Sequence, residues 1–369
     1  LTQIPWSLKF LWAPFIDNYE IPFLTKKIGR RKSWLIIIQF FLFLSILLLG
    51  LSDPNIKLLN TAIFALLVSF FSASQDIVID AYRIDILPDD HQGAGAAMTQ
   101  AGYRIGGIIS GAGALYLREI LTWNYIFLTI GCLILFFAFV TFFAPKENQH
   151  KNKLFNKRSL FSFFSPFKEF LMRGKALNIV LMLSFILFFK FGDVIAGVMA
   201  NPFYVKIGFT NIEIANASKI FGVVATLIGV FLGGWLVKKV GILNSLVISG
   251  FLQIFSNILF FILSILGPQY YFLLVTIAGE NISGGLGSAA FVAYLSVLCN
   301  RQYSASQYAL LSSIMGVART MLSSPAGFLV ETFGWPTFFL LSTFFGIPGM
   351  LILFWMLKKL PLADQISKA

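Results

Sequence analysis

Residues 26–29 read KKIG, and the closely similar KKVG follows at 238–241, which is 212 residues further along the chain. Other residues recur at the same separation: Ser33 and Ser245, Ala81-Tyr82 and Ala293-Tyr294, Ala97 and Ala309, Trp123 and Trp335, and Phe127-Leu128 and Phe339-Leu340. A single match carries little weight, but one separation held across five apolar segments indicates a duplicated helical unit. The basic stretch KENQHKNKLFNKR at 146–158 is then the linker between two halves.

The composition is that of a membrane protein. Of the 369 residues, 57% are hydrophobic and only 12% are charged, and the mean hydropathy is +0.82. A soluble domain carries about 25% charged residues, so this chain could not cover its surface in water. Apolar stretches long enough to cross a bilayer recur from end to end. We therefore predict an all-α membrane protein with eleven spans, at about 1–16, 33–51, 59–80, 94–117, 122–143, 178–203, 214–237, 242–266, 270–298, 306–330 and 335–357.

The repeat divides these spans into two pseudo-symmetric six-helix halves, of which the first is incomplete. The helix at 178–203 opens the second half, and its counterpart in the first half would precede residue 1. We therefore expect an N-terminal bundle at 1–145 that lacks its first helix, followed by a linker at 146–177. A C-terminal bundle at 178–358 and a short tail at 359–369 complete the expected domain organisation.

The basic residues predict the orientation of the chain, whose net charge is +12. One set of loops (17–32, 81–93, 144–177, 238–241, 299–305 and the tail) holds 20 of the 28 Lys and Arg residues. The opposite loops hold only Lys57, Arg118 and Lys206. The positive-inside rule then places the linker and the C-terminus in the cytoplasm. Because topology accounts for the basic charge, we expect no nucleic-acid partner.

Cysteine and histidine usage gives no sign of a metal, a cofactor or a catalytic centre. Cys132 and Cys299 are isolated in or beside apolar segments, which predicts neither a disulfide framework nor a metal-binding spacing. His91 and His150 both fall in polar loops. A membrane-embedded enzyme needs a nucleophile and a base within reach of each other, and the sequence shows no such arrangement. We therefore expect a protein that is not an enzyme.

Two aspartates end an apolar segment in SASQDIVIDAYRID at 72–85. Charge in hydrocarbon costs at least about 2.5–3.5 kcal/mol per residue, so each case requires a partner or a role. Asp76 and Asp80 lie one helical turn apart, where mutual repulsion favours proton uptake by one of them. Arg83, one turn further, can pair with Asp80. We interpret the three as a proton-coupling group, with a charge cluster that latches the cytoplasmic gate as the alternative.

A second group of charges lies in FKFGDVIAG, midway along an apolar segment. Lys190 and Asp193 are spaced i, i+3, which brings them to one side of a helix. An internal ion pair is one reading of this spacing. The other is a proton or substrate site, and we include both residues among the candidates for proton coupling.

Arg104 and Arg319 are candidates for binding an anionic substrate. Both lie about 16–20 Å into a helix that starts on the cytoplasmic side, and they are near-equivalents in the repeat. Two guanidinium groups facing one cavity from opposite halves suit carboxylates, which Arg binds through two hydrogen bonds. Structural pairing of these arginines with Asp76 or Glu280 is the alternative. The polar side chains of Gln75, Glu280 and Asn281 are further candidates for lining a cavity, with ordinary packing as the other reading.

Two six-helix halves joined by a basic loop resemble the plan of the major facilitator superfamily, whose halves pack around a cavity at the membrane midplane. Asp17 followed by GRRK at 29–32 is similar to that superfamily's cytoplasmic loop signature, in which an Asp and a basic run latch the inner gate. The resemblance implies gate roles for Asp17, Arg30 and Arg31. Twelve residues separate Asp17 from Gly29, which is more than in the signature, and solvated positive charge is the alternative.

Six blocks of sequence resemble the AmpG-type muropeptide permeases and follow that family's order over nearly the whole chain. They are SLKFLWAPFID (7–17), SASQDIVIDAYRID (72–85), GAGAAMTQAGYRIG (93–106), KFGD (190–193), ENISGGLGSAAFVAYLSVLCN (280–300) and QYALLSSIMGVART (307–320). The resemblance implies proton-driven import of N-acetylglucosaminyl-1,6-anhydro-N-acetylmuramyl peptides across the bacterial inner membrane. It further implies roles in cell-wall recycling and β-lactamase induction.

The expected partners are thus a small-molecule muropeptide, protons and the lipid bilayer, and we expect a monomer. Two alternatives belong to the same superfamily. The DAYR stretch at 80–83 is also similar to acetyl-CoA transporters, so a carrier of that or another organic anion is one alternative. An inactive, truncated remnant is the other.

Overall fold

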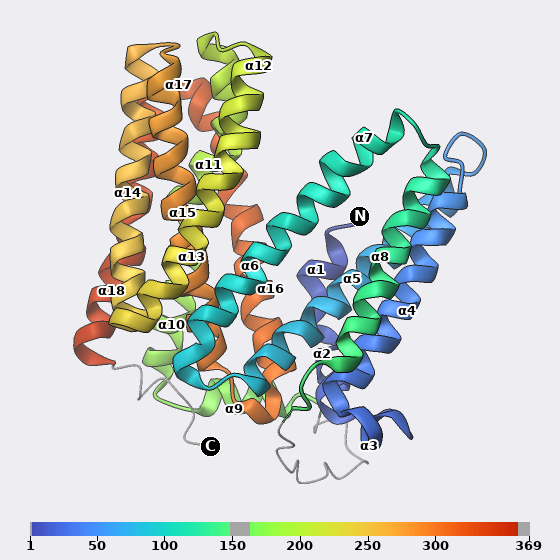
Figure 1. Cartoon of the computed structure of the whole chain (residues 1–369). Coiled ribbons are helices and arrows are strands. Elements are labelled where there is room, and N and C mark those ends of the chain that lie inside the picture. The colour runs from blue at the N-terminus through green and yellow to red at the C-terminus, as the bar shows by residue number, and fades with distance from the viewer. Residues whose placement is uncertain (1, 148–162, 361–369) are drawn as a thin grey trace.

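The computed structural model describes residues 2–147 and 163–360, and every regular element in these ranges is helical (Figure 1). The helices form two bundles that approach each other at one end and diverge toward the other (Figure 1). Residues 144–147 and α9 (Ser165–Met172) lie at the end where the bundles meet, which we call the linker end; the opposite end is the open end. His150, part of the expected linker and most of the expected tail lie outside the described residues.

The N-terminal bundle contains three long helices, α4, α5 and α8, which pack together on one side of the molecule. Its elements are α1 (Ile4–Leu8), η1 (Lys9–Leu11), α2 (Ala13–Asn18), α3 (Leu24–Ile28), α4 (Arg30–Leu51), α5 (Leu58–Ile86), η2 (Asp89–His91), α6 (Gln92–Ile108), η3 (Ile109–Gly113), α7 (Ala114–Arg118) and α8 (Trp123–Phe143). The α6–η3–α7 run crosses obliquely from the linker end near the C-terminal bundle toward the outer end of α8 (Figure 1).

The C-terminal bundle is the more extensively packed of the two and holds the two largest hydrophobic clusters. After α9 its elements are α10 (Ala176–Phe188), α11 (Phe191–Ile207), α12 (Asn211–Ile214), η5 (Ala215–Phe221), α13 (Gly222–Val240), α14 (Ile242–Leu266), α15 (Tyr270–Leu298), η6 (Arg301–Tyr303), α16 (Ser304–Ser323), α17 (Ala326–Phe345) and α18 (Ile347–Lys359). Gly334, at φ +74°, divides α17 at the boundary that the sequence predicts between its last two spans.

Eight helices or joined helical runs among the described residues are long and apolar enough to cross a membrane. The segments expected at 94–117 and 306–330 are largely helical, as α6–α7 and α16, but are not among these eight. The number of eleven spans therefore stays a prediction. The helix expected at 1–16 is wrong as a single element, because α1, η1 and α2 replace it. Pro14, near the start of α2, has no amide hydrogen to continue the preceding turn.

Glycines allow the closest helix contacts, both within the C-terminal bundle and between the bundles. A side chain at Gly229 of α13 would place its first carbon 2.3 Å from the backbone oxygen of Ile282 in α15, so only glycine fits. Between the bundles, a carbon added at Gly234 of α13 would lie 2.8 Å from the side chain of Ala97 in α6. The α6 helix thus packs against the C-terminal half near the linker end, and the two halves make direct contact there.

Candidate functional site

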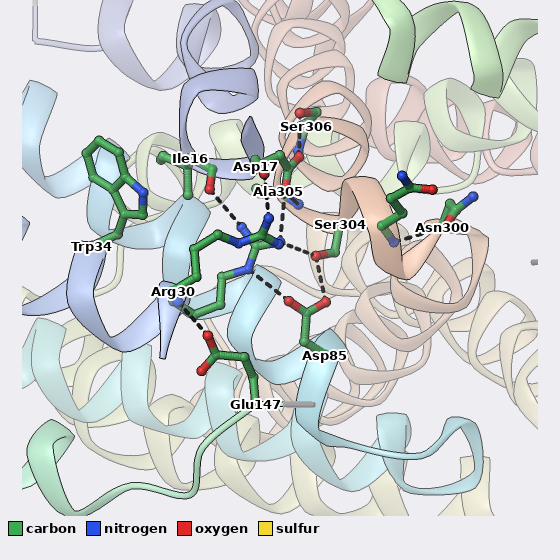
Figure 2. A network of polar contacts seen from close by, with 12 residues as sticks. Ile16, Asp17, Arg30, Trp34, Asp85, Glu147, Asn300, Ser304, Ala305 and Ser306 are labelled. Carbon is green, nitrogen blue, oxygen red and sulfur yellow. Dashed lines mark hydrogen bonds and ion pairs between the residues drawn. The ribbon is translucent and has the colours of Figure 1, made fainter. Parts of the chain in front are cut away.

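A buried charge network closes the linker end (Figure 2). Arg31, at the start of α4, donates from Nη2 to Asp17 Oδ1 at 2.7 Å and from Nε to Asp85 Oδ2 at 2.8 Å. The side chains of Arg31 and Asp17 are fully buried, and that of Asp85 is 4% exposed. The two carboxylates pair with the buried guanidinium charge, and a charge inside a protein requires such partners.

The network also joins the two halves. Ser304 of α16 accepts a hydrogen bond from Arg31 Nη2 at 2.8 Å and donates one to Asp85 Oδ1 at 2.7 Å. The backbone amide of Ser306 donates to Asp17 Oδ2 at 2.7 Å, so this carboxylate sits at the N-terminus of α16, where a helix favours negative charge. We call Asp17, Arg31, Asp85, Ser304 and Ser306 the linker-end latch.

The expected gate residues thus meet despite their separation in sequence. The short helix α3 occupies the extra residues and lets the chain turn back, so that Trp34 Nε1 donates to the Tyr19 backbone oxygen at 2.9 Å. Arg30 donates from Nη1 to the Asp17 backbone oxygen at 2.5 Å. Unlike Arg31, it lies beside the latch and holds the backbone of α2.

Glu147, at the start of the linker, is fixed to the latch. Its Oε1 accepts a hydrogen bond from the Arg31 backbone amide at 2.9 Å, and its side chain is buried against Gly29 (Figure 2). Lys32 Nζ donates to the Ala144 backbone oxygen at 2.6 Å, and Tyr82 donates to the Pro145 oxygen at 2.6 Å. Residues 144–147 therefore pack against the N-terminal half at the base of α4.

A second contact between the halves is centred on Arg83. Its Nη2 lies 3.1 Å from Asp80 Oδ1 on the same helix, and its Nη1 donates to Ser296 Oγ of α15 at 2.9 Å. The guanidinium also lies 5.6 Å from the ring of Tyr308 in α16, a cation–π contact. These contacts of Asp80 and Arg83 fit the alternative reading of the sequence, a charge cluster that holds the cytoplasmic gate closed. Their part in proton coupling stays a prediction.

Asp76 has a different partner. Lys9 Nζ lies 2.6 Å from Asp76 Oδ2, and Lys9 is buried while the Asp76 side chain is 33% exposed. Asp76 is therefore the most accessible of the three aspartates on α5. The neighbouring Gln75 is half-buried, and its Oε1 has no hydrogen-bond partner within the described residues.

The pairing of Lys9 with Asp76 allows a test of whether Asp76 does more than neutralise Lys9. We expect Asp76→Leu to cost about 2 kcal/mol of stability, because the Lys9 ammonium would be left buried without a partner and Asp76 itself is partly exposed. The double variant Lys9→Met/Asp76→Leu should regain the wild-type melting temperature in detergent, yet should not accumulate substrate along a pH gradient. A double variant that melts as low as the single one would contradict the pairing.

The remaining charged candidates are linked by electrostatic interactions that run between elements of both halves. Arg104 of α6 and Arg319 of α16 are exposed, and both interact electrostatically with Lys190 at the start of α11. Asp193 interacts with Lys190 and Arg319, and Glu280 of α15 interacts with Asp193 and Arg104. We call Arg104, Lys190, Asp193, Glu280 and Arg319 the central charge cluster. It holds one arginine from each half, and the expectation that the two face one substrate cavity stays a prediction.

A break between two helices positions Lys190 and Asp193 within the central charge cluster. The chain breaks between α10 and α11, so that Lys190 precedes the first turn of α11 and Asp193 lies within it. Lys190 Nζ donates to Ser288 Oγ of α15 at 2.5 Å, and no direct Lys190–Asp193 ion pair exists among the described residues. Asn281 instead joins two helices, because its Oδ1 accepts from Thr226 Oγ1 of α13 at 2.7 Å.

Sequence reasoning missed several of the residues that make these contacts. Asp85 belongs to the DAYRID stretch, and its spacing from Asp80 and Arg83 was the only signal available for it. Ser304 and Ser306 carry no sequence signal, because a serine becomes a latch residue only through the distant chain segment that meets it. The described part of the chain contains no group of three or more His, Cys, Asp or Glu residues suited to a metal ion.

Solved structures share this architecture. The chain superposes on the transporter FucP in its outward conformation with a TM-score of 0.68 and 14% identity, over 96% of this chain and 88% of that one. The human organic anion transporter MFSD10 gives a TM-score of 0.71 at 12% identity, over 95% of this chain and 82% of that one. At these identities the likeness concerns the fold alone, which consists of two helical halves.

Sequence relatives define the group more closely. The family profile "Major Facilitator Superfamily" matches residues 8–318. The "Putative transporter AmpG 4" of Rickettsia felis is 37% identical over 97% of this chain and 87% of its own length. The "Anhydromuropeptide permease" of Escherichia coli K12 is 36% identical over 94% of this chain and 69% of its own length. The chain belongs to the Major Facilitator Superfamily and, within it, to the AmpG-type transporters. It is a multi-pass membrane transporter and not an enzyme.

Proposed function

We propose that the protein imports anhydromuropeptides across the bacterial inner membrane by proton symport. The central charge cluster supports this proposal, because one exposed arginine from each half interacts electrostatically with the same lysine. A muropeptide has carboxylates at its peptide end, which two guanidinium groups can bind through paired hydrogen bonds. The name of the 36% identical E. coli permease supports the same class of substrate.

In this proposal the binding residues and the coupling residues occupy adjacent regions. Arg104 and Arg319 hold the substrate carboxylates. Polar side chains that line the cavity complete the binding site, namely Gln75, Glu280 and Asn281. The proton-coupling residues are Asp76, Asp80, Arg83, Lys190 and Asp193. Uptake of a proton by a carboxylate of this second group changes the charge that faces the substrate, which is how binding and protonation become linked.

Transport would proceed by rocking of one half against the other. The basic loops favour a cytoplasmic location for the linker end, the linker at 146–177 and the C-terminal tail. With the latch closed and the bundles diverging at the open end, the described conformation then faces the periplasm (Figure 1). Opening of the latch releases substrate into the cytoplasm of the cell. The protein acts as a monomer in this scheme and supplies muropeptides for cell-wall recycling and β-lactamase induction.

An uptake assay with purified protein in liposomes tests the proposal. We expect labelled GlcNAc-1,6-anhydroMurNAc peptide to accumulate when the outer solution is more acidic than the lumen, and accumulation to collapse when a protonophore is added. Acetyl-CoA and simple organic anions should not compete at equal concentration. Uptake of those anions in preference to the muropeptide would assign the transporter to the other substrate class. Equal accumulation with and without the pH gradient would exclude proton symport.

A further inference from the structure

The short helix α9 has one buried face, and hydrogen bonds fix that face in place. The Glu169 carboxylate accepts hydrogen bonds from Arg173 Nη2 at 3.0 Å and from Arg173 Nε at 3.3 Å. Arg173 Nη2 also donates to Gln307 Oε1 of α16 at 2.9 Å, and Gln307 Nε2 donates to the Pro166 backbone oxygen at 3.0 Å. Bonds near both ends of α9 thus hold it against the first turns of α16 and determine which of its faces points inward.

Aromatic contacts give α9 the same orientation. Phe170 is buried in the hydrophobic cluster that also contains Ile179, from the first turn of α10. The ring of Phe167 lies 6.2 Å from the ring of Phe10 in η1. The inward side of α9 therefore packs on both the C-terminal and the N-terminal half.

The opposite side of α9 is exposed and largely apolar. Its residues are spaced three and four apart, which places them together on a helix, and we call them the outer face of α9: Phe164, Lys168, Leu171 and Met172. Each of the three apolar side chains is more than half exposed. In water these groups would stay hydrated, whereas at a membrane surface they can enter the boundary of the acyl chains.

The outer face lies next to the point where the chain enters the membrane. Only residues 173–175 separate α9 from α10, which opens the membrane-spanning run at Ala176–Ile207. Leu177 and Val180, near the start of that run, are apolar and exposed, as lipid-facing residues are. The outer face of α9 thus continues an exposed apolar surface from the spanning run to the linker end.

Four lysines border this apolar surface. Lys168 belongs to the outer face, Lys175 precedes α10, and Lys358 and Lys359 end α18, which packs against α10. All four are exposed, and none makes an ion pair within the described residues. Glu169 is the only acidic residue of α9, and its charge is already paired. The surface therefore carries a positive charge that complements an anionic leaflet.

We propose that the outer face of α9 and these four lysines bind anionic phospholipids of the leaflet at the linker end. The apolar side chains insert among the acyl chains, and the ammonium groups contact the lipid phosphates. The ligand is a lipid and not a soluble anion, because a soluble anion would leave the three apolar side chains in water. This binding surface is independent of the transported substrate and of proton symport.

The melting temperature of the full chain in detergent tests the proposal. The anionic probe is phosphatidylglycerol, and the neutral reference is phosphatidylcholine with the same acyl chains. A ligand that binds only the folded state raises the melting temperature, and we expect phosphatidylglycerol to raise it by about 4 °C more than phosphatidylcholine does. Lys168→Gln/Lys175→Gln should lose at least about half of this difference, because the phosphates lose two of their four partners. Leu171→Ser/Met172→Ser should lose as much, although every charge is intact.

Lys238→Gln/Lys239→Gln is the matched control. It removes two exposed lysines from the last turn of α13, which leads through Gly241 directly into α14 without a surface helix. We expect this variant to keep the wild-type difference between the two lipids. The proposal would be overturned by equal melting of the wild type in both lipids, by full retention of the difference in either α9 variant, or by an equal loss in the control. An equal rise with inorganic phosphate would also overturn it, since the site would then bind a soluble anion.

Discussion

We expect Arg31→Gln to open the linker end, with the largest conformational effect of any single substitution in the latch. The substitution leaves the Asp17 and Asp85 carboxylates buried without their common cation. Removal of one partner from a buried ion pair costs about 3–5 kcal/mol, which is a factor of at least about a hundred in an equilibrium constant. Opening relieves the cost, because both carboxylates then reach water.

Cys299 provides a measurement of this opening. Cys132→Ser leaves Cys299 as the only thiol of the chain. Cys299 follows the last turn of α15 at the linker end and is buried near Arg83. Burial raises the pKa of the Cys299 thiol, so in the closed state the group is protonated at neutral pH and reacts slowly with maleimide. We expect Arg31→Gln to speed labelling at least tenfold, because exposure lowers that pKa toward its ordinary value.

Arg301→Gln is the control, because it makes the same chemical change in another ion pair that joins the halves. Arg301 Nη2 lies 2.9 Å from Asp89 Oδ1, but the two side chains are 33% and 63% exposed. Exposed pairs contribute under about 1 kcal/mol, so labelling of Cys299 should change less than about fivefold. Labelling of Arg31→Gln at the wild-type rate, in protein that melts normally, would show that the latch does not hold the halves together.

The second large effect is expected for Arg104 and Arg319. We predict that Arg104→Gln and Arg319→Gln each raise the KM for anhydromuropeptide about 10–100-fold, because each loses hydrogen bonds to a charged group, worth about 1.5–3 kcal/mol. Replacement by Lys should give an intermediate KM, since the charge remains while the two-pronged geometry is lost. Initial rates of uptake over a range of substrate concentrations measure both effects.

Arg118→Gln is the matched control for this pair. Arg118 is exposed and belongs to the N-terminal half, as Arg104 does, but it ends α7 at the open end, where it donates to the Leu121 backbone oxygen at 3.3 Å. We expect its replacement to leave the KM unchanged within about twofold. An unchanged KM in both Arg104→Gln and Arg319→Gln would exclude these arginines from the binding site.

Much of the fold could be predicted from the sequence, because apolar length and an internal repeat are local properties. The all-helical membrane fold and the superfamily are confirmed. The prediction failed at 1–16, where hydropathy indicated one helix but prolines and a turn at Trp12 divide it. Hydropathy averages over a window and does not register where a backbone amide is missing. The break at Phe189 and Lys190 also escaped prediction, because the same averaging passes over two residues within a long apolar run.

The charged residues of the candidate site could be predicted, because charged residues are rare in membrane-spanning segments and stand out in the sequence. Arg104 and Arg319 stood out from their apolar surroundings, and in the structure both interact electrostatically with Lys190. The identity of the partners was not predictable, because pairing depends on which helices meet. Lys190 bonds to Ser288 and not directly to Asp193, although sequence spacing favoured the latter.

The contact between Glu147 and the amide of Arg31 has a consequence for dividing this protein into pieces. Residues 146 and 147 belong to the expected linker by sequence, yet in the structure Glu147, like Ala144 before it, packs against the start of α4 in the N-terminal half. An N-terminal fragment that ends before Glu147 lacks the acceptor for the Arg31 amide and leaves the start of α4 exposed. Fragments for co-expression, and insertion points for fluorescent reporters, therefore belong after Glu147 and before α9.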